Sequence, residues 1–320
     1  MKNNILVLSA GRRVSLVKAF QKAVVDLNIV GDVFGADINP NMSAACNVLN
    51  RSFVLPHILS EVYIDELKKI CIRESIKLVV PTIDTELLKL AKVKKDFQAI
   101  GITIVVSDIE LVTQCRDKRL THNLFKNIGL PVPHTYPLDN IIFPCFSKPI
   151  SGSLSQNIRI LQTQEELDIW DVPKKEMLYM EIISNKEFDE YTVDTYYDYS
   201  GSLICMVPRQ RLEVRGGEIS KGRTNKSLID LLYEPMSKIN SAFGCLTLQI
   251  FKSKTSDQIL GIEINPRFGG GFPLTNAAGA RYPEFLLREI FLKEDLSYTN
   301  KWEDGLVMLR YDAEVLVKNV

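Results

Sequence analysis

The chain has 320 residues, 46% of them hydrophobic and 24% charged, a balance typical of a folded globular protein rather than a disordered one. The 39 basic residues balance the 39 acidic residues, so the overall charge favours neither nucleic acid nor an anionic membrane surface as a partner. No signal-peptide pattern, no apolar run of ~18 residues and no metal-type spacing of the six cysteines is visible, which predicts a cytoplasmic protein with reduced thiols and no membrane contact.

Short apolar strands alternate with helices over residues 1–112. The apolar run 4–8 is followed by a turn at Gly11 and by a helical apolar face over 14–27. Further strands are predicted at 33–37, 51–56, 77–84 and 101–107, with a helix at 61–75 and another after residue 84. This alternation predicts a mainly parallel sheet with helices on both faces, a Rossmann-like α/β domain.

The first turn of this unit, Ser9-Ala10-Gly11-Arg12-Arg13, contains one glycine, so the sequence does not favour a cofactor site there over a simple tight turn. Asp37 and Asp84 stand at strand ends, where they either cap helices or face a cleft. A substrate-facing role for the segment 84–86 stays open.

The pattern changes after Asp117, where a helix over 118–128 is followed by mostly strand-like segments. Strands are predicted at 143–150, 156–162, 176–183, 190–198, 201–214, 245–254 and 259–265, with a helix at 226–243. This half of the chain is predicted to be α+β with antiparallel sheets.

Three oxygen-bearing side chains fall on the last two predicted strands. Gln249 and Glu263 lie on strands that are predicted to form a hairpin, and Asn265 shares the face of Glu263 because side chains alternate along a strand. One carboxylate with amide oxygens suits Mg²⁺, and Arg267 is placed to bind a phosphate. On composition alone, a solvated hairpin face explains these residues equally well.

Two lysines favour the phosphate interpretation. Lys148 ends a strand and precedes a loop of small residues whose backbone amides can surround a polyphosphate. Lys118 stands at a helix start, where the helix dipole disfavours a cation unless it faces an anion.

Four blocks of sequence resemble, in order and spacing, the successive blocks of the ATP-grasp superfamily. They are DKRLTHNLFKNIGLPVPHTY, FPCFSKPISGS, EIISNKEFDEYTVD and LQIFKSKTSDQILGIEINPRFGGG. The chain most closely resembles one synthetase half of the carbamoyl-phosphate synthase large subunit and its smaller carboxylate–amine ligase relatives. ILVLSAGRRVSLVKAF and GADINP resemble that group's N-terminal domain. The resemblance implies an N-terminal domain at 1–112 and an ATP-grasp domain at 113–320, with a lid-bearing subdomain at 113–180 and a metal-bearing subdomain at 181–320.

The resemblance also implies roles for single positions in binding ATP. Lys118 and Lys148 match the lysines that reach the nucleotide phosphates. The phosphate-covering loop matches Ser151, Gly152, Ser153 and Ser155. The hinge that reads the adenine edge matches Glu181, Ile182 and Ile183. The acid that binds the ribose hydroxyls matches Glu190, with Glu187 as a rival.

On the metal side, Gln249, Glu263 and Asn265 match the magnesium ligands, and Mn²⁺ would suit the same oxygen donors. Arg267 matches the phosphate-transfer arginine, which with Lys148 and Asn265 forms the implied catalytic set. Arg209 and Arg211 match a stretch on the acceptor side of the cleft.

The implied activity is that of a ligase. A substrate carboxylate attacks the γ-phosphate of MgATP, and an amine captures the resulting acyl phosphate; no protein nucleophile is required. The partners are then a small-molecule carboxylate and amine, and a homodimer is compatible with the chain. The phosphate loop lacks a second glycine at Gln156 or Asn157, which keeps open a nucleotide-binding regulatory protein with weak turnover. A small-molecule kinase is the other alternative.

Overall fold

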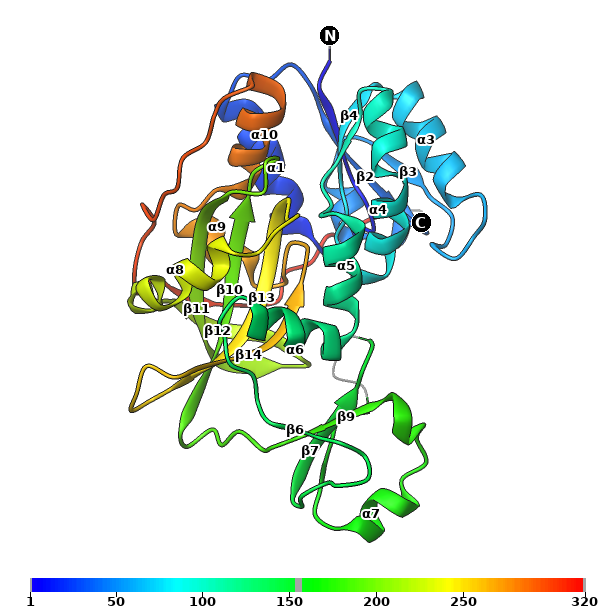
Figure 1. Cartoon of the computed structure of the whole chain (residues 1–320). Coiled ribbons are helices and arrows are strands. Elements are labelled where there is room, and N and C mark those ends of the chain that lie inside the picture. Colours follow the sequence, from blue (N-terminus) through cyan, green and yellow to red (C-terminus); the bar gives the residue numbers. More distant parts are fainter. Residues whose placement is uncertain (1, 153–156, 319–320) are drawn as a thin grey trace.

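Five parallel strands form the first sheet in the computed structural model, which describes residues 2–152 and 157–318 (Figure 1). The strands run in the spatial order β3-β2-β1-β4-β5. They are β1 (Asn4–Val7), β2 (Val33–Asp37), β3 (Ser52–Val54), β4 (Ile76–Val80) and β5 (Thr103–Ile104). Their continuous apolar character reflects burial on both faces, as expected for a parallel sheet.

Different helices cover the two faces of this sheet. The helices are α1 (Val14–Asp26), η1 (Pro40–Met42), α2 (Ala44–Asn47), α3 (Tyr63–Arg73) and α4 (Asp84–Ala99). Ile5 and Val7 of β1 belong to the hydrophobic cluster that includes α1, whereas Leu6 and Leu8 belong to the cluster with α3 and α4. The alternation of side chains along β1 therefore packs α1 on one face of the sheet and α3 and α4 on the other.

A small antiparallel sheet carries Lys148 and lies at one end of the molecule (Figure 1). Its spatial order is β6-β9-β7-β8. The strands are β6 (Thr135–Tyr136), β7 (Cys145–Pro149), β8 (Arg159–Leu161) and β9 (Met177–Met180), accompanied by α7 (Gln164–Ile169) and η2 (Lys174–Glu176). Cys145 and Tyr179 pack under α7, while Phe146 and Leu178 form a separate cluster on the other side.

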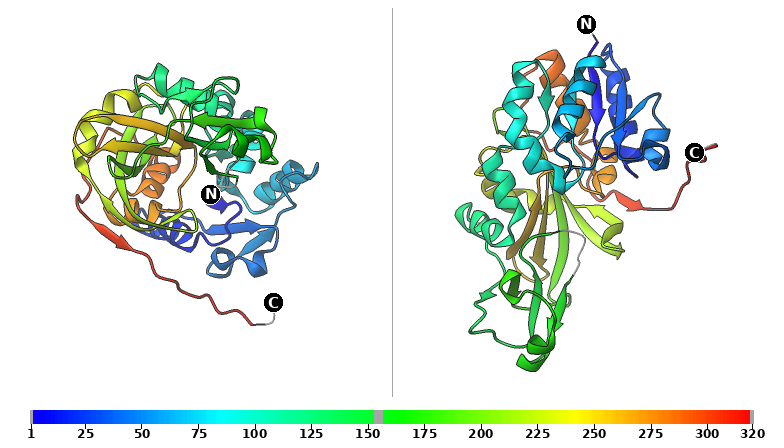
Figure 2. Two further views of the ribbon diagram at one scale, coloured as in Figure 1. Left: turned by 90° about the horizontal axis from the view of Figure 1, so that it is seen from below. Right: turned by 90° about the vertical axis from the view of Figure 1, so that its right-hand side faces the viewer.

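The third sheet is antiparallel and carries the predicted metal ligands. Its spatial order is β14-β13-β10-β11-β12-β15. The strands are β10 (Phe188–Tyr197), β11 (Leu203–Arg215), β12 (Glu218–Thr224), β13 (Gly244–Ser253), β14 (Ile259–Asn265) and β15 (Val307–Leu309). After β15 the chain runs away from the rest of the molecule (Figure 2).

Helices from both halves of the chain pack on this sheet and tie it to the first one. They are α5 (Ile109–Arg116), α6 (Lys118–Asn127), η3 (Lys226–Leu228), α8 (Ile229–Ser237), α9 (Phe272–Ala277) and α10 (Tyr282–Leu292). Phe20 of α1 meets Phe268 edge-on at 6.0 Å between ring centroids. Phe125 of α6 lies over Gly261 of β14, where a Cβ would come within 2.5 Å of the ring. This close approach positions the start of α6, and with it Lys118, beside β14.

The predicted fold class is confirmed: an N-terminal parallel sheet is followed by two antiparallel sheets with helices. The helix predicted at 226–243 is shorter, because α8 ends at Ser237 and residues 238–243 are irregular before the positive-φ Gly244. The domain limits at residues 112 and 180 stay our proposal. In the described part of the chain, no helix combines the length and apolar character that a membrane span requires.

A buried carboxyl group holds the start of α4. Glu86 is 0% exposed and accepts hydrogen bonds from the Thr82 and Ile83 amides and from the Ser9 and Tyr63 hydroxyls. Burial raises the pKa of Glu86 to about 7, because loss of water disfavours the carboxylate more than these hydrogen bonds favour it.

We predict that Glu86→Gln flattens the pH dependence of stability. The pKa of Glu86 rises from 4.5 to about 7 on folding, so this group's contribution to stability is complete below about pH 4.5 and is lost as the pH rises through 7. Urea unfolding between pH 4.5 and 8 measures the slope. Glu66→Gln, at a half-exposed position of α3, should keep the wild-type slope. An unchanged slope in Glu86→Gln would contradict the assignment.

Candidate functional site

The predicted metal ligands meet on one face of the β13–β14 pair. Gln249 lies directly opposite Glu263, and Asn265 opposite Thr247. The Gln249 amide Nε2 donates to Glu263 Oε1 at 2.7 Å, and Asn265 Nδ2 donates to the same oxygen at 3.0 Å. One carboxylate and two carboxamides therefore converge on a half-buried spot, as the alternation of side chains predicted.

This donor set can be tested against the needs of Mg²⁺. Among the described residues, no three Asp, Glu, His or Cys side chains gather closely enough to bind a metal ion. The convergent set at Glu263 instead offers only hard oxygen donors with one formal charge, and Mg²⁺ is commonly bound through one or two carboxylates plus substrate phosphates and water. Binding would require the two amides to turn their oxygens toward the ion. The residues fit Mg²⁺ on these terms.

Two buried lysines face Glu263 from different elements. Lys118, at the start of α6, donates from Nζ to the Gly152 carbonyl at 3.1 Å, and Lys148 of β7 is only 5% exposed. Burial lowers the pKa of both ammonium groups, that of Lys148 to about 8, while the negative charge of Glu263 opposes this shift. His122, one turn along α6, is buried and has its pKa lowered to about 4 by burial and by the adjacent lysines. The region thus carries positive charge that the protein only partly neutralises.

The predicted phosphate loop is only partly described. Ser151 and Gly152 are exposed, and Gly152 has a φ of 110°, which favours glycine. Ser153 and Ser155 lie outside the described residues. The contact between Gly152 and Lys118 brings the start of this loop to the lysines.

The predicted adenine hinge follows β9 as a segment without regular secondary structure. The Glu181 amide donates to the His134 carbonyl at 2.9 Å, and the Glu181 carboxylate accepts from the His134 amide at 2.7 Å. Within the described chain, no backbone hydrogen bond uses the amide nitrogens of Ile182 and Ile183. These groups are therefore free to bind a ligand edge.

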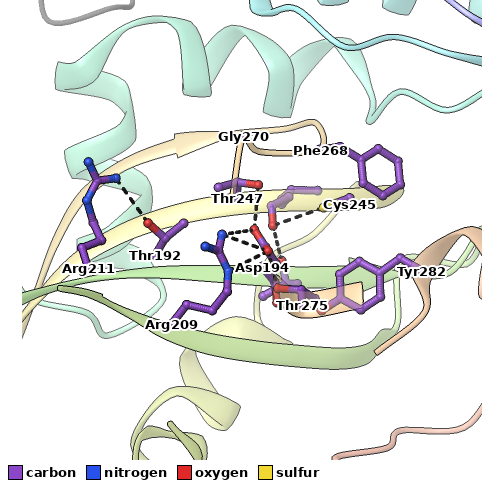
Figure 3. Close-up of polar contacts among 12 residues, drawn as sticks. Thr192, Asp194, Arg209, Arg211, Cys245, Thr247, Phe268, Gly270, Thr275 and Tyr282 are labelled. Carbon is purple, nitrogen blue, oxygen red and sulfur yellow. Dashed lines mark hydrogen bonds and ion pairs between the residues drawn. The ribbon is translucent and has the colours of Figure 1, made fainter. Parts of the chain in front are cut away.

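The two candidate ribose-binding acids, Glu190 and Glu187, lie in different surroundings. Glu190 is half-buried on β10, and its pKa is raised by burial and by Glu263 while Arg211 lowers it. Glu187 is exposed in a turn. Arg211 lies 3.1 Å from Glu190. It donates to the Thr192 hydroxyl at 3.4 Å (Figure 3). Thr192 pairs with Gln249, so Arg211 lines the same face as the predicted metal ligands.

We correct the expectation that Arg209 meets a substrate. Its guanidinium is 0% exposed and bonds Asp194 through Nε and Nη2, both at 3.0 Å (Figure 3). Thr247 and Thr275 also donate to the Asp194 carboxylate. A Cβ at Gly271 would stand 2.2 Å from Arg209 Nη1, so this glycine closes the backbone over the arginine. Arg209 is part of the core beneath the site.

Arg267 forms an ion pair with Asp84, which follows β4 at the carboxyl end of the parallel sheet. Its Nη2 lies 2.6 Å from Asp84 Oδ2, and the two side chains are each 14% exposed. The same nitrogen is 3.4 Å from Asn265 Oδ1. Asp84 therefore holds Arg267 beside the predicted metal ligands.

Sequence reasoning missed Arg13, which lies close enough to Arg267 for the two charges to repel. Burial and, next, the positive charge of Arg267 lower the pKa of Arg13 to about 10, although Glu218 and Asp84 oppose this shift. The two arginines stand at opposite ends of the sequence, so no local pattern could pair them. The only available signal was the dibasic turn after β1.

The cavity beside the predicted metal ligands is smaller than another cavity in the described part of the molecule. A cavity of about 30 Å³ is lined by Asp84, Lys118, Gly152, Glu263 and Asn265, among others. A larger cavity, of about 300 Å³, lies between β11, α10 and residues 295–302, away from these side chains. We define the candidate site by its convergent charges and amides, because cavity volume alone does not identify a site chemistry.

Two family models match separate parts of the chain. Residues 5–105 match the model described as "PylC-like, N-terminal domain". Residues 173–312 match "ATP-grasp in the biosynthetic pathway with Ter operon". The second match contains Glu181, Glu190 and all three predicted metal ligands. No curated protein sequence matches the chain significantly.

Solved structures share the fold at low identity. The biotin carboxylase domain of Hydrogenobacter thermophilus 2-oxoglutarate carboxylase, in complex with MgADP, ADP and bicarbonate, has a TM-score of 0.72 at 15% identity, covering 96% of this chain and 73% of that one. Staphylococcus aureus N5-carboxyaminoimidazole synthetase with ADP has a TM-score of 0.70 at 12% identity, covering 93% and 80%. Rhizobium etli pyruvate carboxylase has a TM-score of 0.64 at 14% identity over 88% of this chain. The chain spans only 28% of that carboxylase. These identities establish the fold alone.

We predict that Asp194→Ala destabilises the protein strongly. It leaves the buried Arg209 cation without its partner, and breaking a buried pair in this way costs about 3–5 kcal/mol. Urea unfolding at neutral pH measures the change. Asp189→Ala, on the same strand but in a half-exposed pair with Lys254, should cost below about 1 kcal/mol. Equal losses in the two variants would contradict the role given to Asp194.

Proposed function

The chain belongs to the ATP-grasp superfamily, and we propose that it is an ATP- and Mg²⁺-dependent ligase that joins a carboxylate to an amine. The observation that carries the proposal is the convergence of three parts of the chain. The first part is the oxygen-rich face of Gln249, Glu263 and Asn265. The second is the pair of lysines near Glu263, Lys118 and Lys148. The third is Arg267, which lies beside Asn265.

The cationic side chains would bind the polyphosphate of ATP. Lys118 and Lys148 neutralise phosphate oxygens, and a buried ammonium is worth more to such an anion than an exposed one because water screens it less. A phosphate also restores the solvation that burial removes from these lysines. Ser151 and Gly152 would close over the phosphates, while the Ile182 and Ile183 amides bind the adenine edge and Glu190 the ribose hydroxyls.

Bond making in this reaction takes place between the substrates. A carboxylate oxygen attacks the γ-phosphorus, the bond from that phosphorus to the β-phosphate oxygen breaks, and ADP leaves. The amine then attacks the acyl carbon of the acyl phosphate, loses a proton and releases inorganic phosphate. Arg267 stabilises the charge that spreads over the transferring phosphoryl group, and Asn265 and Lys148 orient it.

Glu263, with the amide oxygens of Gln249 and Asn265, would hold the divalent ion. When bound, Mg²⁺ or Mn²⁺ supplies Lewis-acid neutralisation of the phosphate oxygens. The MgADP bound in the Hydrogenobacter thermophilus domain supports this choice of ion.

The remaining parts of the proposal concern partners and location. The substrates are a small-molecule carboxylate and a small-molecule amine. We place the enzyme in the cytoplasm, where its six free cysteines stay reduced. A homodimer is also proposed, by analogy with the Hydrogenobacter thermophilus domain, which is described as a dimer.

An assay of ADP release against a panel of carboxylates, with and without amines, tests the proposal. A ligase releases ADP stoichiometrically with amide when both substrates are present. ADP release with accumulation of a stable phosphorylated product and no effect of amine identifies a kinase. ATP binding without ADP release from any pair identifies a regulatory nucleotide-binding protein and overturns the ligase.

We predict that Glu263→Gln lowers Mg²⁺-dependent ATP turnover by at least about 100-fold, because it removes the only carboxylate of the convergent set. Its melting temperature should stay near that of the wild type, since Glu263 is half-buried and a glutamine retains the shape. Glu234→Gln, at an exposed position of α8, serves as the matched control. Unchanged turnover in Glu263→Gln would rule out this metal site.

A further inference from the structure

A row of three side chains crosses the third sheet from the buried core to the candidate site. Asp194 of β10 pairs with Thr247 of β13, and Thr247 pairs with Asn265 of β14. Asp194 is 0% exposed and Thr247 is buried, whereas Asn265 is half-buried among the predicted metal ligands. Because paired residues of adjacent strands present their side chains on the same face, this row connects the buried pair of Arg209 and Asp194 to the site.

The Thr247 hydroxyl contacts both the core and the turn that follows β14. Its oxygen lies 3.1 Å from Asp194 Oδ1 (Figure 3) and 3.0 Å from the carbonyl oxygen of Arg267. A hydroxyl carries one proton, so these two acceptors share it. Gly269 belongs to the same turn as Arg267, and a Cβ on it would stand 2.9 Å from Thr247 Oγ1. The backbone of this turn therefore packs directly on Thr247.

The turn in its own right determines where the Arg267 guanidinium lies. The Arg267 amide donates to the Asn265 carbonyl at 2.8 Å, and Arg267 Nη1 donates to the Phe268 carbonyl at 3.3 Å. Nη2 forms the ion pair with Asp84. Because one guanidinium nitrogen is bound to the turn's own backbone, a shift of that backbone moves the guanidinium with it.

The Asp194 carboxylate ties Thr247 to elements on both sides of the turn. Thr275 of α9, the helix that follows the turn, donates to Asp194 Oδ2 at 2.6 Å. Arg209 of β11 donates to both carboxylate oxygens. Water is excluded from this carboxylate, and hydrogen bonds in such surroundings are stronger than exposed ones. The buried network thus sets the position of the turn against β13.

We propose that Thr247 is a positioning residue for phosphoryl transfer. Held by Asp194, its hydroxyl fixes the Arg267 carbonyl and with it the guanidinium that stabilises the transferring group. This inference rests on the proposed function, because the transfer role of Arg267 belongs to that proposal. A displacement of about 1 Å in a transfer group lowers the rate up to about 100-fold, whereas the two buried lysines that would bind the nucleotide do not depend on Thr247.

Thr247→Val tests the role of the hydroxyl, because valine has a similar shape without the oxygen. Asp194 keeps its hydrogen bonds to Arg209 and Thr275, so the buried carboxylate stays paired and the variant should fold. The assay uses the carboxylate–amine pair identified by ADP release. We expect kcat to fall about 10- to 100-fold and KM for MgATP to stay within about twofold of the wild-type value. Thr247→Ser retains the hydroxyl and should restore most of kcat.

Thr195→Val is the matched control for loss of a buried hydroxyl. Thr195 is 0% exposed, and its hydroxyl donates to the Leu246 carbonyl at 3.2 Å. It lies next to Asp194 on β10 and so points to the opposite face of the sheet. Thr195→Val should lower the melting temperature about as much as Thr247→Val and leave kcat unchanged. An equal effect of the two variants on kcat, or no recovery in Thr247→Ser, contradicts the positioning role.

Hydrogen exchange measures the support of the turn without requiring turnover. Mass spectrometry of peptides that cover residues 264–272 follows amide exchange in the nucleotide-free protein. We expect Thr247→Val to speed exchange in this segment about tenfold, because an anchor of its backbone is lost, and Thr195→Val to leave the exchange rate as in the wild type. Unchanged exchange in Thr247→Val overturns the inference, whether or not the protein is a ligase.

The two proposals fail in different ways. Faster exchange in Thr247→Val, in a protein that releases no ADP with any substrate pair, overturns the proposed function and leaves the support of the turn by Thr247 intact. Ligase activity with kcat unchanged by Thr247→Val overturns the positioning role and leaves the proposed function intact.

Discussion

The pairing of β13 with β14 determines where the candidate site lies. Because Gln249 stands opposite Glu263, two carboxamides and one carboxylate share a face with Thr192 and Arg211. A slip of one residue would send one strand's polar side chains to the opposite face, which is packed with apolar residues, and would bring apolar ones to the site. The register is therefore held by burial on one face while the other face stays polar.

The other groups come to this face from elements that are independent of it. Lys118 arrives because α6 packs closely on Gly261, and Lys148 comes from a separate small sheet. Asp84, at the carboxyl end of the parallel sheet, holds Arg267 in an ion pair. Each contribution depends on a different packing interface, so movement of one part would change the charge around Glu263 without unfolding the others. The buried lysines are the groups whose electrostatic energy such a movement would alter most.

Local patterns were sufficient for most strands and for the shared face of Gln249, Glu263 and Asn265, because alternation and turn residues depend on a few neighbouring positions. They were insufficient for Arg209. Arg209 was named through a family resemblance, and its burial depends on Asp194, Thr275 and Gly271, which come from other elements. The length of α8 was overestimated because an apolar helical period continues into the irregular residues that follow it. The surroundings of Arg13 could not be read from the sequence, since its neighbours lie far along the chain.

The ion pairs of Glu218 have a consequence for folding. Glu218 joins Arg12, 206 residues earlier, to Arg310, 92 residues later, and Arg310 also donates to the Gly270 carbonyl. During synthesis the parallel sheet emerges long before its partners. The rim of the cleft therefore closes late, through contacts of high sequence separation that form slowly. Until then Arg12 stays hydrated, and the turn after β1 lacks its ion pair with β12.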